Sequence, residues 1–342
     1  MLLVCRAKMM KAVNMTYKHG GDDLYQNRLF SYLQKQLKVK INEMKPIRKN
    51  VYFIEGENIE FILKGFSSYQ RYMNQNDLSE ALLKEGFSQT YSFYQLANSP
   101  PLFFEKKYYG TIEYLQPSEE SFTYSEEKHQ KEALDLLARY HTATEKLTET
   151  FKDRLSVFKQ VDKWVERTSI FLSHLPVVRY YVQKEIINEL LYWADWSLKG
   201  IRQEGQMFKK GKKVILHGDV AHHNFLRGRN NQLYLIDFDL ISLGTPHCDY
   251  LQFANRILPN LDWSFEKLSS FDRMAPYLHE KGFIYGLGFP TDIFREWNRA
   301  IRDRTYLSNE DKINQLLEIT VSQFKARQEF FKELKNQIAG GY

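Results

Sequence analysis

The spacing of hydrophobic positions changes once along the chain, from mostly strand-like to mostly helical. Leu29, Leu33 and Leu37 recur at helical spacing near the start, and short apolar segments bounded by turn residues then follow as far as residue 115. From residue 125 onward apolar positions recur every three or four residues. The pattern predicts a helix at 22–37, strands at 51–54 and 59–66, a short helix at 77–85, strands at 90–96, 102–105 and 108–115, helices from 125 and at 160–174 and 179–203, strands at 214–216 and 233–236, helices within 262–285 and 290–306, and a final helix at 309–337.

This change of texture predicts an α+β protein with two lobes. Residues 1–115 would form a small lobe of antiparallel sheet with helices, and residues 116–342 a larger, mostly helical lobe. A chain of 342 residues is long enough to bury a core in each.

The most informative polar residues lie at the ends of the two late strands. His217-Gly218-Asp219 follows the first strand, Asn224 comes five residues later, and Asp237 follows the second strand. A Gly/Asn-rich turn separates the strands, so we expect one β-hairpin to bring these side chains to a single point.

Asp219, Asn224 and Asp237 suit phosphoryl transfer, which needs Mg²⁺ held by hard oxygen ligands and an acceptor hydroxyl aimed at the phosphorus. Asp219 is the candidate catalytic base for the hydroxyl proton. Asn224 and Asp237 are the candidate metal ligands. ATP and Mg²⁺ are therefore the expected cofactors.

The order Asp, Asn at plus five and Asp-Phe resembles the protein-kinase catalytic loop, and HGD in place of HRD resembles the aminoglycoside phosphotransferase and choline kinase branch. Within that branch, HGDVAHHN and LIDFD are similar to the CotS-type (YutH-like) endospore coat-associated kinase-like proteins. The resemblance implies a two-lobed protein-kinase-like fold. It also implies that the buried Asp249 supports the catalytic loop rather than reacting. His217 is expected to hydrogen-bond the backbone near Asp237 and so fix the hairpin.

Lys64 lies in the apolar strand IEFILKGF and is the candidate phosphate anchor of the small lobe. The alternative is an edge-strand lysine that points to solvent, since strands alternate faces. Glu80 is a candidate partner for the Lys64 ammonium, with Glu85 as a competitor. No GxGxxG motif precedes Lys64, and Arg48-Lys49-Asn50-Val51 stands in the place of a phosphate-covering loop.

The segment around Glu113 and Leu115 precedes Gln116-Pro117 and is the expected linker between lobes, where backbone groups would meet the adenine edge. Asp239 is either a further metal ligand or a solvated carboxylate. His222 and His223 face either the acceptor or solvent.

Composition narrows these interpretations. Hydrophobic residues make up 43% and charged residues 26% of the chain, as in ordinary globular proteins. The formal charge of +6 is not patterned, so nucleic-acid binding is disfavoured, although aromatic residues reach 15%. Two cysteines favour a reducing compartment, and no apolar segment predicts a membrane span or a signal peptide. We therefore expect a cytoplasmic protein. The resemblance to coat-associated proteins implies the mother cell, with assembly into the spore coat as the alternative location.

A zinc site built from His217, His222, His223, His247 and Cys248 is a weak alternative, because their spacing matches no standard pattern.

Two functions are consistent with the sequence. The first is an ATP- and Mg²⁺-dependent phosphotransferase that acts on a hydroxyl or amine of a small molecule or coat component. The second is a catalytically silent, kinase-fold scaffold of the spore coat, favoured by the missing glycine motif. Other spore coat proteins are candidate partners in either case, whereas the acceptor and the oligomeric state are not specified by the sequence.

Overall fold

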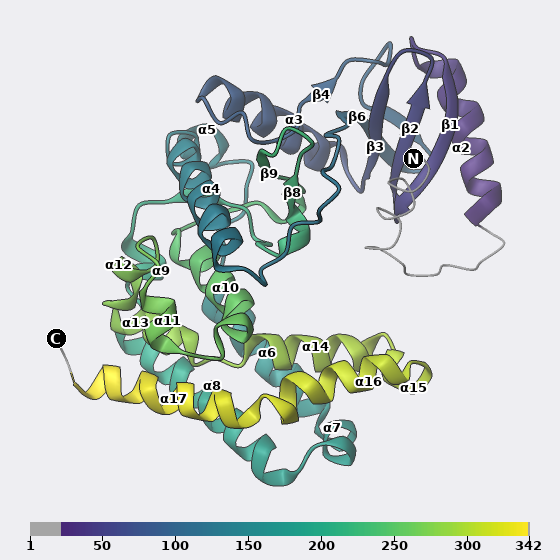
Figure 1. Ribbon diagram of the computed structural model, residues 1–342. Coiled ribbons are helices and arrows are strands. Elements are labelled where there is room, and N and C mark those ends of the chain that lie inside the picture. Colours follow the sequence, from purple (N-terminus) through teal and green to yellow (C-terminus); the bar gives the residue numbers. More distant parts are fainter. Residues whose placement is uncertain (1–21, 341–342) are drawn as a thin grey trace. The chain divides into compact units, whose positions relative to one another are not determined.

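The computed structural model describes residues 22–340, which form two compact units. The first unit contains residues 22–122 and the segment Asn224–Asp239, and the second contains Thr123–His223 and residues 240–340. The six-stranded sheet lies in the first unit and most helices in the second (Figure 1), which confirms the predicted α+β class. The predicted division into lobes at residues 1–115 and 116–342 stays a prediction. In the structure, the segment Asn224–Asp239 packs with the sheet.

The sheet of the first unit is antiparallel throughout, in the order β1-β2-β3-β6-β4, with β5 paired to β6. The β1–β2 connection is a tight turn at Lys49 and Asn50, with Asn50 at a φ of 61°. The elements of this unit are α2 (Asp22–Gln36), β1 (Ile41–Arg48), β2 (Val51–Gly56), β3 (Glu60–Phe66), α3 (Tyr69–Lys84), β4 (Phe93–Tyr94), β5 (Leu102–Phe104), β6 (Lys107–Glu113), β8 (Phe225–Arg227) and β9 (Leu233–Leu235).

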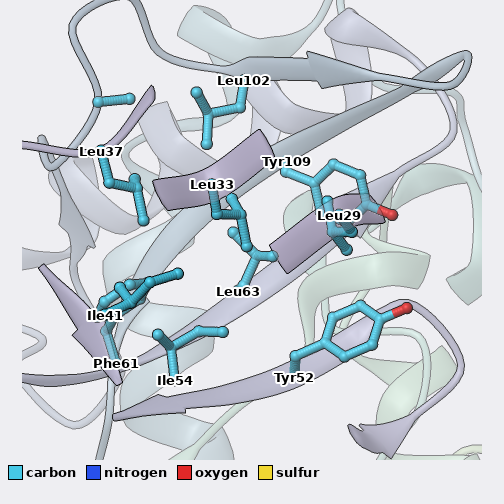
Figure 2. Close-up of a cluster of buried hydrophobic side chains, with 11 residues drawn as sticks. Leu29, Leu33, Leu37, Ile41, Tyr52, Ile54, Phe61, Leu63, Leu102 and Tyr109 are labelled. Carbon is cyan, nitrogen blue, oxygen red and sulfur yellow. The ribbon is translucent and has the colours of Figure 1, made fainter. Parts of the chain in front are cut away.

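One hydrophobic cluster fixes α2 to the sheet (Figure 2). Leu29 and Leu33 of α2 are fully buried, as the helical spacing predicts, and they pack in one cluster with Phe61 and Leu63 of β3. Burying a leucine or phenylalanine side chain contributes about 1.5–3 kcal/mol relative to leaving it exposed. Because successive side chains of a strand point to opposite faces, Leu63 lies in this core and the next side chain, Lys64, points to the other face.

Helix α3 is longer than the predicted 77–85. It begins at Tyr69, because the Ser68 hydroxyl accepts a hydrogen bond from the Arg71 amide at 3.3 Å and caps the first turn. It ends as predicted, before Gly86, whose φ of +83° suits glycine after a helix.

The single hairpin predicted for the late strands is wrong. Strand β7 (Val214–Leu216) pairs with β10 (Ser242–Gly244) in the second unit, whereas β9 pairs with β8 in the first. Each of these strands has three residues, so its own hydrophobic pattern is too short to specify a partner.

Helices make up most of the second unit, with α13 packed on α8 and α14 packed on α6. The predicted final helix is interrupted by a π-helical segment, Glu318–Ser322. The remaining bounds are α4 (Glu127–Glu145), α5 (Thr148–Phe151), α6 (Gln160–Ser173), α7 (Leu175–Tyr181), α8 (Lys184–Glu204), α9 (Met207–Lys210), α10 (His247–Ile257), α11 (Phe265–Ser269), α12 (Ala275–Leu278), α13 (Lys281–Leu287), α14 (Thr291–Arg302), α15 (Thr305–Ser308), α16 (Glu310–Leu317) and α17 (Phe324–Ala339), with short 3₁₀ turns at His222–Asn224, Phe238–Leu240 and Leu258–Leu261.

Among the described helices, none is long and apolar enough to cross a membrane. Cys248 is a buried free thiol, and Cys5 lies outside the described residues.

Candidate active site

Lys64 is buried on β3, with only 5% of the residue exposed, so the solvent-facing alternative is excluded. Its ammonium lies 2.8 Å from an Asp237 oxygen and 2.7 Å from an Asp239 oxygen. It also donates to the Gln75 side chain of α3 at 3.1 Å. Burial alone would lower the pKa of Lys64, but Tyr91 and the two carboxylates raise it, so the lysine is held as a cation.

Asp237 receives a second cation, because Arg48 at the end of β1 approaches its other oxygen at 2.7 Å. Burial would raise the pKa of the Asp237 carboxyl, but Lys64 and Arg48 together hold it below its ordinary value. The backbone at Asp237 has a φ of +72°, an uncommon conformation for a residue other than glycine. This turn directs the carboxylate toward Lys64 directly after β9.

The β8–β9 hairpin brings Asn224 close to Asp237 in the first unit. The Asn224 carbonyl accepts a hydrogen bond at 2.9 Å from the amide of Ile236, the residue before Asp237. Asn224 is buried, and Phe238 on the other side of Asp237 is fully buried against the Tyr91 ring. Packing therefore fixes the hairpin end that carries both predicted metal ligands.

The residue types of this cluster are ones that hold a magnesium ion. Asp237 and Asp239 converge on the Lys64 ammonium, and Asn224 lies at the same end of the hairpin, where its main-chain carbonyl pairs with Ile236. Carboxylate and amide oxygens are the ligands that Mg²⁺ accepts in phosphate-binding sites. A zinc site has no support in residues 22–340, where no three His, Cys, Asp or Glu side chains group closely enough to hold a metal.

Two of the three other predicted nucleotide-binding residues, Glu80 and Glu113, have structural partners of their own. Glu80 accepts a hydrogen bond from Asn76 at 3.2 Å, so Gln75, and not Glu80, is the α3 residue that contacts Lys64. The Glu113 carboxylate accepts from the Ser92 amide at 3.1 Å at the end of β6. Leu115 is half-buried just beyond it, and the backbone contact of this segment with adenine stays a prediction.

Asp219 lies in the second unit, on the loop after β7, and a third of its side chain is exposed. The preceding Gly218 has a φ of +80°, and a Cβ atom there would come 2.4 Å from the Leu240 carbonyl oxygen. Only glycine fits this turn without strain. The backbone conformation and the close approach of Leu240 therefore explain why the HGD motif has glycine at position 218.

Asp249 braces this loop from α10. Its carboxylate accepts hydrogen bonds from the His217 amide at 2.8 Å and the Gly218 amide at 3.0 Å, and it contacts the His141 ring at 2.9 Å. Burial would raise the pKa of Asp249, but the His141 hydrogen bond and the His217 contacts lower it, so the buried carboxylate stays ionised. The His217 ring in turn accepts from the Asp219 amide at 3.4 Å.

Four residues that contact the predicted site residues were missed from the sequence. Gln252 bonds the Val220 amide at 2.7 Å and the Gly218 carbonyl at 3.0 Å, and Arg256 lies 3.2 Å from Asp219. Both follow Asp249 on one face of α10, at three and seven residues, and that spacing was a usable signal. Arg48 carried no such signal, because Asp237 is remote in the chain, and Gln75 was missed because the helix was predicted to begin only at residue 77.

The first unit thus holds Lys64 beside oxygen donors suited to a metal–phosphate complex, and the second holds an accessible carboxylate suited to accept a proton. That Asp219 meets Asn224 and Asp237 at one point stays a prediction.

Together, the sheet unit, the helical unit and these residues define a kinase-like phosphotransferase fold. The chain belongs to the phosphotransferase enzyme family, whose model matches residues 48–277.

Solved structures of low sequence identity share this fold. An aminoglycoside phosphotransferase from Alicyclobacillus acidocaldarius matches with a TM-score of 0.69 and 16% identity, over 90% of this chain and 95% of that one. The choline kinase LicA from Streptococcus pneumoniae matches with a TM-score of 0.53 and 14% identity, over 90% and 99%. The AMP-bound spectinomycin phosphotransferase APH(9)-Ia matches with a TM-score of 0.54 and 13% identity, over 92% and 99%.

Proposed function

We propose that the protein is an ATP- and Mg²⁺-dependent phosphotransferase that moves the γ-phosphate to a hydroxyl or amine of a small molecule or coat component. The observation that carries this proposal is the buried Lys64–Asp237 pair at 2.8 Å. Burying an ion pair is costly, so such a pair is weak evidence for stability by itself. The position of the Lys64–Asp237 pair beside Asp239 and Asn224 therefore favours a role of the pair in function.

The roles of the residues follow from their chemistry. Lys64 would bind the α- and β-phosphates. Arg48, beside the β1–β2 turn, would exchange its contact with Asp237 for a contact with the phosphates. Asn224 and Asp237 would hold Mg²⁺, which when bound neutralises phosphate charge. Asp219 would accept the proton of the attacking hydroxyl, and the backbone from Glu113 to Leu115 would bind the adenine edge.

The spore-coat setting of this proposal rests on the HGDVAHHN and LIDFD motifs described above. It implies a mother-cell protein that acts on, or assembles with, coat components.

A second candidate is a kinase-fold scaffold without turnover. Two observations favour it: the β1–β2 turn leaves only Lys49 and Asn50 in the place of a phosphate-covering loop, and Arg48 already occupies one Asp237 oxygen.

Thermal-shift titration with ATP and MgCl₂ separates the two candidates. Ligand at about 100 times its Kd stabilises the fold by about 2.7 kcal/mol, which corresponds to several degrees in Tm. We expect this shift in the wild type, its loss in Asp237→Ala, and its retention in Glu57→Ala, a change at an exposed acid of the same unit. Absence of any shift in the wild type would favour the scaffold.

A further inference from the structure

Arg48 and Lys64 lie in one row across the sheet of the first unit. Arg48 of β1 pairs with Val51 of β2, and Val51 pairs with Lys64 of β3. Residues that lie directly opposite each other on neighbouring strands point to the same face of a sheet. The two basic side chains therefore share one face, and Arg48 and Lys64 contact different oxygens of Asp237, at 2.7 and 2.8 Å.

A β-bulge at the end of β1 gives Arg48 this direction. Pro46 pairs with Tyr52. Regular antiparallel pairing would then place Ile47 opposite Val51. The register shifts by one residue between Pro46 and Arg48, and Arg48 takes that place instead. Without the extra residue, the Arg48 side chain would point to the opposite face of the sheet.

The turn that follows Arg48 is held by two other strands. The Asn50 carbonyl accepts a hydrogen bond from the Gly65 amide of β3 at 2.7 Å, and the Asn50 side chain accepts one from the Lys107 ammonium of β6 at 2.6 Å. A Cβ atom at Gly65 would lie 3.0 Å from the Asn50 Cβ atom, so glycine lets the turn lie close against β3. The backbone beside Arg48 is therefore fixed, while 42% of the Arg48 side chain is exposed.

The β1–β2 turn is too short to cover phosphates with its own backbone, as a glycine-rich loop does in kinases. Only Lys49 and Asn50 connect the two strands, and no GxGxxG motif precedes Lys64. The group that this end of the sheet offers instead is the Arg48 guanidinium, whose planar fork matches the oxygens of a phosphate.

We propose that Arg48 replaces the glycine-rich loop as the residue that binds the terminal phosphates of the nucleotide, and that Asn50 and Lys107 are its positioning residues. This inference rests on the proposed phosphotransferase function and assigns its nucleotide selectivity. The bulge and the turn hold the backbone, so only the arginine side chain has to move from Asp237 to a phosphate. AMP has no phosphate beyond the first and would gain nothing from Arg48.

The test uses the full chain and measures the Kd of ATP and of AMP by calorimetry in MgCl₂. We expect the wild type to bind ATP more tightly than AMP. Arg48→Met should weaken ATP binding by about tenfold or more, the usual effect of losing a charge-assisted hydrogen bond, and leave AMP binding unchanged. Arg48→Lys should restore part of the ATP affinity, because lysine keeps the charge without the planar fork.

The positioning residues have a readout of their own. Asn50→Gly keeps the left-handed backbone conformation and removes the side-chain contact with Lys107. This variant and Lys107→Met should each weaken ATP binding by about threefold, within the range of one hydrogen bond. Neither change should weaken binding further in an Arg48→Met background, because both act through Arg48. Lys40→Met, at an exposed lysine that pairs with Glu57, should bind ATP as the wild type does.

Each variant is first checked for the wild-type circular dichroism spectrum. The inference is wrong if Arg48→Met binds ATP as the wild type does, or if it loses ATP and AMP affinity by the same factor. It is also wrong if Asn50→Gly and Lys107→Met still weaken ATP binding in the Arg48→Met background. If the wild type binds neither nucleotide, the inference and the proposed function both fail. ATP binding with the expected variant pattern but without ADP release would contradict the proposed transfer alone.

Discussion

An aspartate with little access to water stays ionised only if cations or hydrogen-bond donors replace that water. At Asp237 this is done by Lys64 at 2.8 Å and Arg48 at 2.7 Å. The same three charges that would organise a metal–phosphate complex therefore compensate one another without it, and removing one partner leaves the others unpaired. This double role makes the site measurable through stability.

The pH dependence of stability should report the ionisation of Asp237. The folded-state pKa lies below the ordinary value of 3.8, so the charge stabilises the fold above that value, and the contribution is lost as pH falls toward the folded pKa. Asp237→Asn should lower the free energy of unfolding most at neutral pH and progressively less below about pH 4. Urea denaturation from pH 7 to pH 3, with Glu57→Gln as control, measures this. A wild-type-to-variant difference that is constant with pH would contradict it.

The backbone conformation of Gly218 sets the position of the next residue, the candidate base Asp219. Alanine there must adopt a φ of +80° and would place its Cβ atom 2.4 Å from the Leu240 carbonyl oxygen. The left-handed conformation alone costs about 1–2 kcal/mol. Gly218→Ala should therefore lower the free energy of unfolding by at least that amount and misplace Asp219. Gly86→Ala, which has positive φ but no close neighbour, isolates the conformational part. Equal losses in the two variants would mean that the contact with Leu240 relaxes freely.

At the scale of elements, α10 holds the Asp219 loop from one helix face through Asp249, Gln252 and Arg256. Asp249→Asn keeps the shape but removes the charge and one acceptor, and it leaves an NH₂ group facing a backbone amide. Removing one partner from a buried charged network costs about 3 kcal/mol or more.

Asp249→Asn should therefore reduce the free energy of unfolding by about that amount and also lower turnover. The matched control is Asp135→Asn, an exposed acid on α4 paired with Arg273, which should change stability by less than about 0.5 kcal/mol. Guanidinium denaturation distinguishes the two. Similar small losses in both would show that Asp249 does not brace the loop.

The elements that sequence reasoning predicted well are those with a long periodic pattern. Leu29 and Leu33 lie in α2 as their spacing predicted, and Lys64 was identified as an isolated lysine in the apolar strand β3. The pairing of β7 with β10 was missed, because three-residue strands leave strand choice to tertiary packing. The start of α3 was missed because the Ser68 cap precedes the apolar positions that were used.

The candidate site shows the same division between local and remote information. Asp219, Asn224 and Asp237 were found because a motif places them close together in the chain. Arg48 contacts Asp237 from a remote part of the chain, and no spacing in the sequence connects the two. Gln75 contacts Lys64 from the part of α3 that precedes the predicted start at residue 77. Gln75, and not Glu80, contacts Lys64. Even when a helix is predicted in the right part of the chain, the sequence does not specify which of its residues faces a given partner.

At the scale of the whole molecule, the candidate residues divide between the two units. Lys64, Asn224 and Asp237 belong to the sheet unit, and Asp219 with its support belongs to the helical unit. If Asp219 acts only as a base, nucleotide binding should not depend on it.

Asp219→Asn should therefore keep the Tm shift with ATP and MgCl₂ while ADP release falls by about 10²–10⁴-fold, the range lost with a general base. Asp237→Asn should lose both the shift and the release, because its carboxylate contacts Lys64 and Arg48 directly. A coupled-enzyme assay for ADP, run beside the thermal shift on the same samples, measures the two effects together. Loss of the shift in Asp219→Asn would mean that Asp219 contributes to nucleotide binding and is not a base alone.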